Sequence, residues 1–402
     1  MRLRSDENLW EREDKNGLEI YEPLKNNISI DIAVIGGGIT GALISEALTD
    51  AGLEVALIEK NTIGSGSTLA STSFLQYETD MHLQKLSEKI GLNEAAEVYR
   101  ECKGAVETIK NLISRYNIDC EFKNKNSLNF AHDNKMAGEL KKEFELRKKF
   151  FNDIRFLSEE ELLKDFHVKS KAGILSMNAG AMNPVAFTRQ LIFNNYNKGL
   201  KVYTNTKIIS IADYRLNYKI LTTENGSRII CNFLVFCTGY ETFNFIKKCS
   251  ARLFSTWAVA TKEHEEVPEV FKDVLFWNTA SPYLYFTATG NGRLIAGGGD
   301  TLFRPVNFTE NLKQRKSSLI CRKFRYYVQG KELKPEISWG GVFGSSRDSL
   351  PIIGKVNGSK NVFAVVGLGG NGIVFSVLGM QMVLSMIRKK KHAFEKYFLP
   401  CR

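Results

Sequence analysis

Three glycines near the N-terminus have the spacing of a phosphate-binding turn. Gly36, Gly38 and Gly41 form G-x-G-x-x-G, and Glu59 follows at the end of the next apolar run. In such a turn the first glycine permits a tight bend, the second lets the backbone approach a pyrophosphate, and the third allows close packing of helix on strand. A carboxylate at the position of Glu59 can accept hydrogen bonds from the ribose hydroxyls of an adenosine. The pattern predicts an adenine dinucleotide and does not distinguish FAD from NAD.

The elements that would position these residues surround them. Residues 32–35 and 53–58 are short, β-branched apolar runs that are typical of buried strands. Between them, apolar residues recur every fourth position on one face of a predicted helix, which Gly52 ends. A glycine-rich turn alone is often an ordinary connection between a strand and a helix. The order of strand, turn, helix, strand and acid favours the dinucleotide interpretation.

Two other segments are candidates to contact the same ligand. Residues 64–73 are rich in glycine and hydroxyl side chains, and they follow the strand that ends at Glu59. A flexible linker is the alternative, but the ends of strands in α/β sheets are where ligands bind. Residues 367–373, GLGGNGI, lie between an apolar strand at 362–366 and a helix that continues to Ile387. The N–H groups and the dipole of that helix would suit the negative end of a reduced flavin ring.

Composition places the chain among ordinary globular proteins. It has 402 residues, of which 43% are apolar and 25% charged, and this length suggests two or three domains, or two discontinuous ones. The longest apolar run, residues 373–387, is interrupted by polar residues, so no membrane span is expected. The charged N-terminus has no apolar core of a signal peptide, and a cytoplasmic location is expected. Seven cysteines without a C-x-x-C pair predict reduced thiols and no metal site.

The formal net charge of +11 has two interpretations. A lysine-rich, solvated surface is one, and attraction to anionic substrates or RNA is the other. No RNA-binding motif supports the second, and we expect no clear nucleic-acid or membrane partner. Residues 1–29 precede the first strand as a polar arm, in which Trp10, Leu18, Tyr21 and Leu24 are candidates to anchor it to the body.

The middle of the chain predicts a second sheet with flanking helices. Helices are expected at 94–113, 135–151, 184–198 and 311–328, and a capping box starts a short helix at Ser158. Alternating apolar residues predict strands at 127–131, 201–213, 218–223, 228–236, 253–262, 283–289 and 293–297. Asn225-Gly226 predicts a hairpin turn. Residues 339–354 are expected to form a loop.

Together these residues resemble the D-amino-acid-oxidase-like (DAO) family of FAD-dependent oxidoreductases, which includes glycine oxidase, sarcosine oxidase and γ-glutamylputrescine oxidase. The motifs that carry the resemblance are IGGGITG at 35–41, IEK at 58–60, GSGSTLASTS at 64–73, FCTGY at 236–240, GRLIAGGGD at 292–300, WGG at 339–341, DSLPIIG at 348–354 and GLGGNGI at 367–373. The resemblance implies an α/β fold in which an FAD-binding, Rossmann-like domain accompanies a discontinuous second domain built on a mixed or antiparallel sheet. The FAD-binding domain would comprise residues 1–88, 158–245 and 345–402, and the substrate domain residues 89–157 and 246–344.

Carried over position by position, the resemblance implies a set of FAD contacts. They are Gly36, Gly38, Ile39, Thr40, Gly41, Glu59, Lys60, Ser67, Thr68, Thr72, Ser73, Phe74, Ile208, Thr238, Gly239, Gly367, Gly369, Gly370, Asn371, Gly372 and Ile373. Relatives that bind flavin covalently use a cysteine after the W-x-G motif. No cysteine occurs between Trp339 and Gly354, so the resemblance implies non-covalent FAD.

The substrate side departs from the family pattern. Amino-acid oxidases of this family place an arginine two residues after W-x-G to hold the substrate carboxylate, and Phe343 stands there in this chain. Glycine oxidase has a second arginine in the C-terminal loop, where this chain has Gly370. Tyr285 matches a family tyrosine beside the flavin, although a tyrosine packed in the sheet is an equal alternative. We expect Tyr285, Phe343 and Asn371 on the substrate side of the flavin.

The activity implied by the resemblance is oxidation of a C–N bond in a small amine or amino-acid-like substrate, by hydride transfer to flavin N5. One alternative is oxidation of a 2-hydroxy acid or a polyol-phosphate-type alcohol on the same fold, which would require a base and an anion clamp. Two others are an RNA-associated flavoprotein and a non-catalytic flavin-binding module. The sequence leaves the substrate, the electron acceptor and the oligomeric state open.

Overall fold

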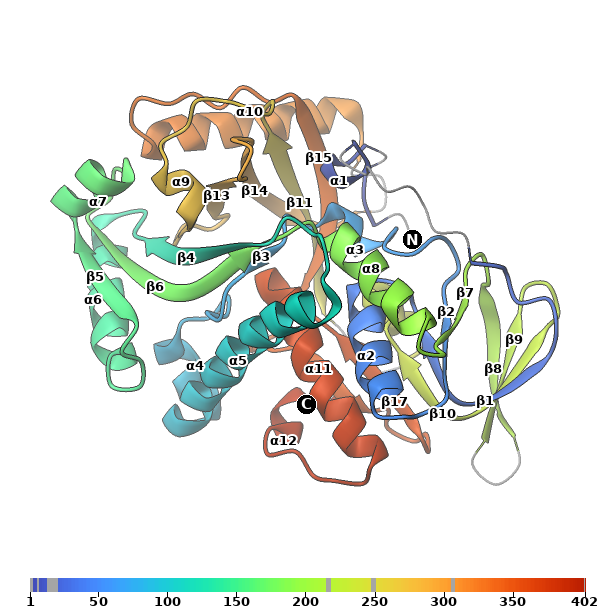
Figure 1. The fold of residues 1–402 in the computed structure, drawn as a ribbon. Helices are drawn as coiled ribbons and strands as arrows, with labels where there is room; N and C mark the ends of the chain where they lie inside the picture. Colours follow the sequence, from blue (N-terminus) through green and yellow to red (C-terminus); the bar gives the residue numbers. More distant parts are fainter. Residues whose placement is uncertain are drawn as a thin grey trace.

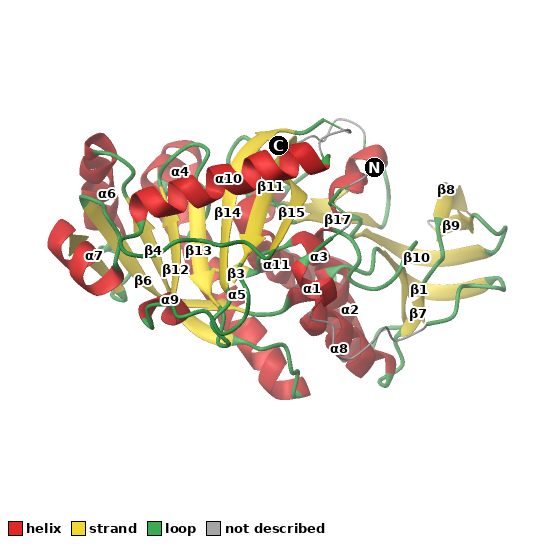
Figure 2. Cartoon of the chain, turned by 90° about the horizontal axis from the view of Figure 1, so that it is seen from above, coloured by secondary structure: helices red, strands yellow, loops and turns green. Residues whose placement is uncertain are grey.

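The structure, a computed structural model, describes residues 3–5, 7–12, 21–214, 218–246, 251–304, 308–400 and 402. Two sheets lie next to each other, with a group of long helices packed against the first and one long helix across the second (Figures 1 and 2). This arrangement confirms the predicted α/β class with two sheets.

The first sheet has eight strands, and its centre is parallel. Strands β17, β10, β1, β2 and β7 run parallel in that order, while β16 and the β8–β9 hairpin add antiparallel pairs. The bounds are β1 Ile28–Ile35, β2 Val55–Ile58, β7 Lys201–Tyr203, β8 Ile208–Tyr214, β9 Tyr218–Thr223, β10 Arg228–Phe236, β16 Ile352–Lys355 and β17 Val362–Val366. Since the central strands are buried on both faces, they appear in the sequence as continuous apolar runs.

Four helices bury the largest apolar cluster of the molecule against this sheet. They are α2 Ile39–Asp50, α5 Leu92–Tyr116, α8 Pro184–Tyr196 and α11 Gly372–Ile387. The hydroxyls of Thr40 on α2 and Ser376 on α11 lie 2.8 Å apart, so the first turns of these two helices are in direct contact. The sequence predicts no membrane span, yet the helical stretch at residues 369–387 is long and apolar enough to cross a membrane. Of this stretch, 67% is buried inside the protein. Its packing is that of a core helix.

The second sheet has nine strands, in the order β15-β11-β14-β13-β12-β4-β6-β3 with β5 beside β6. All its pairs are antiparallel except β4 with β12. The bounds are β3 Phe74–Leu75, β4 Lys123–Phe130, β5 Ile154–Ser158, β6 Ala172–Ala181, β11 Arg252–Ala260, β12 Val274–Asn278, β13 Leu284–Ala288, β14 Leu294–Leu302 and β15 Ile337–Ser345. Helix α10, Glu310–Tyr327, lies across this sheet (Figure 2).

The remaining helices are short or peripheral. They are α1 Leu9–Arg12, α3 Ser67–Ala70, α4 Leu83–Ile90, α6 Asn134–Arg147, α7 Glu159–Phe166, α9 Val270–Asp273 and α12 Glu395–Phe398, with 3-10 turns η2 Gly239–Asn244 and η3 Gly369–Asn371. The capping box predicted at Ser158 is present, since its side chain accepts from the N–H of Glu161 and the Glu161 carboxylate accepts in return.

Two sequence expectations about strands are wrong. Residues 201–213 do not form one antiparallel strand: β7 pairs parallel with β2, and β8 pairs antiparallel with β9. The segment 339–354, expected as a loop, begins with the second half of β15. Its glycines are required by packing, because a Cβ on Gly340 would lie 2.8 Å from the ring of Phe308, and one on Gly344 would lie 2.9 Å from that of Tyr240.

The sheets cut across the predicted domain boundaries at two places. Strands β3 and β6 fall in ranges assigned to the FAD-binding domain, yet they belong to the nine-stranded sheet. The division into two domains stays a prediction. In the N-terminal arm Trp10, Tyr21 and Leu24 are buried, and Leu18 lies outside the described residues.

Candidate active site

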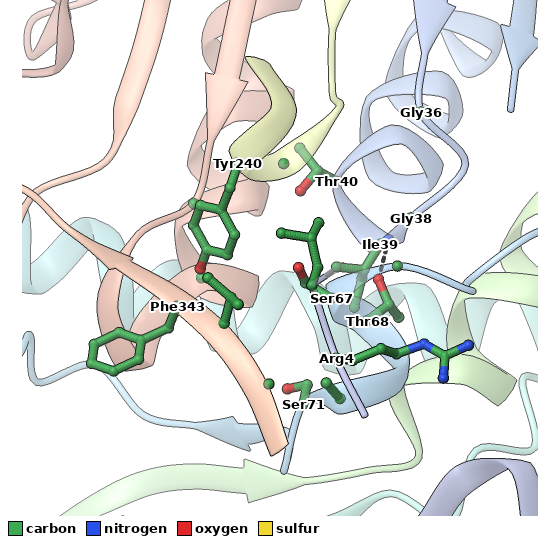
Figure 3. Close-up of a pocket in the computed structure, with 18 of the residues that line it drawn as sticks. Arg4, Gly36, Gly38, Ile39, Thr40, Ser67, Thr68, Ser71, Tyr240 and Phe343 are labelled. Carbon is green, nitrogen blue, oxygen red and sulfur yellow. Dashed lines mark hydrogen bonds between the residues drawn. The ribbon is translucent and has the colours of Figure 1, made fainter. Parts of the chain in front are cut away.

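A cavity of about 550 Å³ lies where the two glycine-rich turns meet the nine-stranded sheet. Its size is within the range of small-molecule sites. Its walls come from the first turn, the 65–76 segment, the C-terminal loop and strands β13 and β15. Figure 3 shows residues of these segments converging around it.

The first glycine turn has the geometry that its sequence predicts. Gly36 has φ of +110°, and a Cβ there would lie 2.4 Å from the carbonyl oxygen of Cys237. A Cβ on Gly41 would lie 1.9 Å from the carbonyl oxygen of Gly36. Only glycine therefore permits the tight bend and the close approach of α2 to β1.

Glu59 is fixed at the end of β2 by two backbone groups. Its Oε2 accepts from the N–H of Gly37 and its Oε1 from that of Asn61, each at 2.7 Å. Burial raises the pKa of Glu59, and these two N–H groups act in the opposite direction. The carboxylate lines the cavity and keeps acceptor capacity for ligand hydroxyls.

Hydroxyl side chains and a lysine complete this half of the cavity. The Thr68 hydroxyl accepts from the N–H of Ile39 at 3.0 Å, the bond drawn in Figure 3. This bond occupies the N–H of Ile39 at the start of α2. The Thr68 hydroxyl, which accepts it, can still donate its own hydrogen to a phosphate. Lys60 donates to Glu241 at 2.6 Å, and both line the cavity.

The C-terminal loop faces the first turn across the cavity. A Cβ on Gly367 would lie 2.3 Å from the carbonyl oxygen of Gly372. The N–H of Gly370 is directed at Asp80, 3.1 Å and 3.0 Å from its two carboxylate oxygens. Asp80, which precedes α4 in the sequence, thus contacts this loop, and the sequence analysis did not identify it as a site residue.

The structure brings most of the predicted contact residues together. Lining the cavity are Gly36, Gly38, Ile39, Thr40, Glu59, Lys60, Ser67, Thr68, Thr72, Phe74, Ile208, Thr238, Gly239, Gly367, Gly369, Gly370, Gly372 and Ile373. Gly41, Ser73 and Asn371 are not among the lining residues. Gly41 packs under the turn, while Asn371 is buried and donates to the carbonyl of Gln76 at 2.9 Å, which places it behind the wall.

Aromatic rings from β13 and β15 line one part of the cavity, which is called its aromatic end below. Tyr285 is buried in β13 and makes an edge contact with Phe74, with ring centroids 5.2 Å apart. Tyr283 lies 5.5 Å from Tyr285 between centroids, and Phe343 stacks on Phe254. Burial raises the pKa of Tyr285 and of Tyr283 above their usual values, so both stay neutral phenols at physiological pH.

The N-terminal segment also reaches the cavity, which the sequence analysis missed. Leu3 and Ser5 bond to β15 as an added edge strand, through Leu3 O with Val342 N and Ser5 N with Gly340 O. Arg4 therefore lies at the cavity, where its Nε donates to the carbonyl of Ser65 at 3.0 Å (Figure 3). No sequence motif marks Arg4, because pairing of this short segment with β15 depends on the folded sheet.

Comparison with known proteins decides the family. A family model described as FAD-dependent oxidoreductase (DAO) matches residues 31–383. The chain belongs to the FAD-dependent oxidoreductase (DAO) family. It is an FAD-dependent oxidoreductase, as the sequence resemblance predicted.

Two relatives and two solved structures illustrate how far this DAO-family protein has diverged. It is 24% identical to the putative Rieske 2Fe-2S iron-sulfur protein YhfW of Bacillus subtilis, over 96% of this chain and 74% of that protein. It is 22% identical to glycine oxidase of Geobacillus kaustophilus, over 91% of this chain and 94% of the oxidase. The crystal structure of that oxidase superposes with a TM-score of 0.76, 19% identity and coverage of 93% and 99%. L-Proline dehydrogenase from P. horikoshii gives a TM-score of 0.76, 21% identity and coverage of 95% and 98%.

The cavity of this DAO-family protein fits FAD. The glycine turn leaves the backbone bare where a pyrophosphate approaches, and Glu59 presents a carboxylate where the adenosine ribose belongs. The second glycine-rich loop and the aromatic end remain for the flavin ring. FAD when bound supplies the two-electron acceptor that the side chains lack.

Proposed function

We propose that this protein oxidises the C–N bond of an amine or an amino-acid-like substrate. The observation that carries the proposal is the chemistry at the aromatic end of the cavity. Phe343 and Gly370 occupy the two positions where amino-acid oxidases of the family carry carboxylate-binding arginines, and both line the cavity. The basic residues among its described lining are Arg4, Lys60 and Lys207, which bond to Ser65, Glu241 and Glu224. Lys60 and Lys207 belong to segments around the end of β2 and the start of β8, while Arg4 belongs to the N-terminal segment beside β15 and directs its guanidinium to Ser65.

This distribution supports an amine over an anionic alcohol. A 2-hydroxy acid or a polyol phosphate needs a positive group beside the reacting carbon, and no described lining residue supplies one at the aromatic end. An aromatic pocket suits a neutral amine, which is the form that can lose hydride. In this reaction the substrate would lose the hydrogen next to nitrogen together with its electron pair, and nitrogen would lose a proton, which leaves a C=N bond; bound FAD would supply the two-electron acceptor. Water then hydrolyses the imine to a carbonyl compound and a free amine.

The chain's own residues orient the substrate and exclude water. Tyr283, Tyr285 and Phe343 would hold the reacting carbon in place. In the same proposal FAD is held without a covalent bond, through Glu59, Thr68 and the two glycine-rich segments. The five described cysteines are free thiols, which suits the reducing cytoplasm that we propose as its location.

Anaerobic mixing with panels of amines, amino acids and hydroxy acids tests the proposal. Bleaching of the oxidised flavin absorbance by amines or amino acids is expected. Bleaching by hydroxy acids or polyol phosphates alone would contradict it.

A further inference from the structure

Asp80 is a carboxylate inside the cavity that neither FAD binding nor the reaction described above requires. It lies between β3 and α4, and its side chain is open to the cavity. Its protein partner is the N–H of Gly370, which both carboxylate oxygens approach. Among the described residues, no lysine, arginine or histidine comes within ion-pair distance of it. The charge of Asp80 is thus left without a counter-charge from the described chain.

The surroundings of Asp80 are suited to a cation. Tyr283, Tyr285 and Phe343 line the same end of the cavity and present π systems, which attract alkylammonium groups. The charge of Asp80 acts on both Tyr283 and Tyr240, so these groups share one electrostatic environment. Cavity walls of low dielectric strengthen the attraction between a carboxylate and an ammonium group.

A second carboxylate lies close to the aromatic end of the cavity. Asp300 on β14 is close enough to Asp80 and Tyr283 for its charge to influence both. Its Oδ1 is buried without a hydrogen-bond partner, and the neighbouring hydroxyl of Thr256, a residue that lines the cavity, acts to lower its pKa. Two lysines lie nearby, but Lys316 donates to the carbonyl of Gly299 and Lys323 to that of Pro282. Asp300 is therefore a second acidic group near the aromatic end, and Lys316 and Lys323 act on its pKa in the direction opposite to Asp80.

The acidic and basic residues of the described lining occur in different combinations at the two ends of the cavity. Lys60 and Lys207 lie around the end that suits the adenosine of FAD, where Glu59, Glu241 and Glu224 offset their charge, and Asp80 lies at the aromatic end. A substrate carboxylate at the aromatic end would meet the charge of Asp80 and no arginine.

We propose that Asp80 is the cation-binding residue of the substrate site, and that the substrate is a positively charged amine without a carboxylate beside its reacting carbon. The proposal rests on the proposed function in one respect, since it places the substrate in the same cavity. It narrows the substrate class from amines and amino acids to cationic amines, such as diamines, whose second ammonium group remains charged while the reacting nitrogen is neutral.

Two probes of nearly equal shape test the charge preference without any reaction. Tetramethylammonium and pivalate are similar in size and opposite in charge, and neither has a C–H bond on a carbon attached to a neutral amine. Each is titrated into the FAD-loaded protein while the flavin absorbance difference spectrum is recorded. Tetramethylammonium is expected to bind at least tenfold more tightly than pivalate. Equal affinities, or tighter binding of pivalate, would overturn the proposal.

Two variants assign the effect to Asp80. Asp80→Asn keeps the shape and removes the charge, and it should weaken tetramethylammonium binding about tenfold while pivalate binding improves. Glu159→Gln, which removes an exposed carboxylate on α7 paired with Lys171, should leave both affinities unchanged. If Asp80→Asn alters the flavin spectrum but neither probe affinity, the carboxylate acts on the flavin and the proposal is wrong.

Outcomes for this proposal and for the proposed function remain separable. Selective binding of tetramethylammonium with no bleaching by any amine would reject amine oxidation and keep the cation site. Bleaching by zwitterionic amino acids combined with tighter binding of pivalate would keep C–N oxidation and reject the cation site.

Discussion

Glu59 Oε2 lies 2.7 Å from the backbone nitrogen of Gly37, so the acid at the end of β2 is bonded to the glycine turn itself. The other oxygen, Oε1, holds the N–H of Asn61. This pair of bonds aligns the carboxylate before any ligand arrives. The acid and the turn therefore act as one preorganised unit, and a change in either should affect binding of FAD.

Replacing Glu59 with glutamine should weaken FAD binding. A glutamine side chain has one carbonyl oxygen, so its amide NH₂ must face either the N–H of Gly37 or that of Asn61, and one bond is lost. The loss of about 1–3 kcal/mol corresponds to a roughly five- to 150-fold higher Kd. FAD retained after dialysis measures it. Glu54→Gln, at an exposed glutamate just before the same strand, is the control, and equal retention in both variants would contradict the role of Glu59.

Gly41→Ala should separate α2 from the first turn. Its Cβ would lie 1.9 Å from the carbonyl oxygen of Gly36, so backbone must move, and a loss of about 1–3 kcal/mol in the free energy of unfolding is expected. Gly104→Ala is the matched control, because it is an exposed helical glycine in α5 with nothing near its Cβ position, and it should stabilise by up to about 1 kcal/mol. Thermal unfolding of both variants is the measurement. An unchanged Tm for Gly41→Ala would show that the turn tolerates a methyl group.

The sequence predicted the elements whose signals are local. The strand, turn, helix and acid from Ile32 to Glu59 depend on short-range periodicity and on glycines with defined backbone roles. The same holds for the strand and helix around the C-terminal loop. These two regions supply the two glycine-rich turns of the cavity, but only a minority of the residues that line it.

The parts that the sequence missed depend on contacts between distant residues. Asp80 faces Gly370 across 290 positions of sequence, and nothing near Asp80 in the chain marks it as a site residue. Arg4 reaches the cavity because Leu3 and Ser5 pair with β15. The sequence predicts a loop from Trp339 onward, where β15 continues to Ser345, because the glycines that make room for Phe308 and Tyr240 resemble loop glycines in a linear sequence.

Phe343→Arg should reverse the charge preference at the aromatic end. The new guanidinium can pair with a carboxylate ligand or with Asp80, and either outcome lowers the affinity for cations. We expect roughly tenfold tighter pivalate binding, in line with one charge-assisted hydrogen-bonded pair. Flavin difference spectra measure it, and Phe343→Leu controls for loss of the ring. If pivalate binds equally to both variants, the side chain at this position points away from the ligand.

Arg4→Ala should speed the dissociation of FAD. The guanidinium lies at the cavity beside Ser65, where it adds positive charge near the expected phosphates. Its removal should raise the Kd of FAD about three- to tenfold, and the remaining affinity should depend less on salt concentration. Arg12→Ala is the control from the same segment, since Arg12 is exposed and pairs with Glu336 outside the cavity. Identical FAD off-rates for the two variants would remove Arg4 from the binding site.

Asp300 should lower the stability of the protein at neutral pH. Burial raises its pKa from 3.8 to about 6, with the charge of Asp80 acting in the same direction and Lys316 and Lys323 in the opposite one. Between these two values the folded state binds more protons than the unfolded state, so stability decreases as pH rises through this window and the loss is complete above about pH 6.

Asp300→Asn, which mimics the protonated form, should therefore stabilise the protein above pH 6 by about 3 kcal/mol, and the gain should vanish near pH 4. Thermal unfolding of the apoprotein between pH 4 and pH 8 is the measurement, and Asp165→Asn, an exposed aspartate on α7, is the control. A gain that stays constant across this range would mean that the effect is steric. A loss of stability at pH 8 would mean that Lys316 and Lys323 stabilise the ionised carboxylate more than burial disfavours it. The charge of Asp300 would then stabilise the fold, and it would not lower stability at neutral pH.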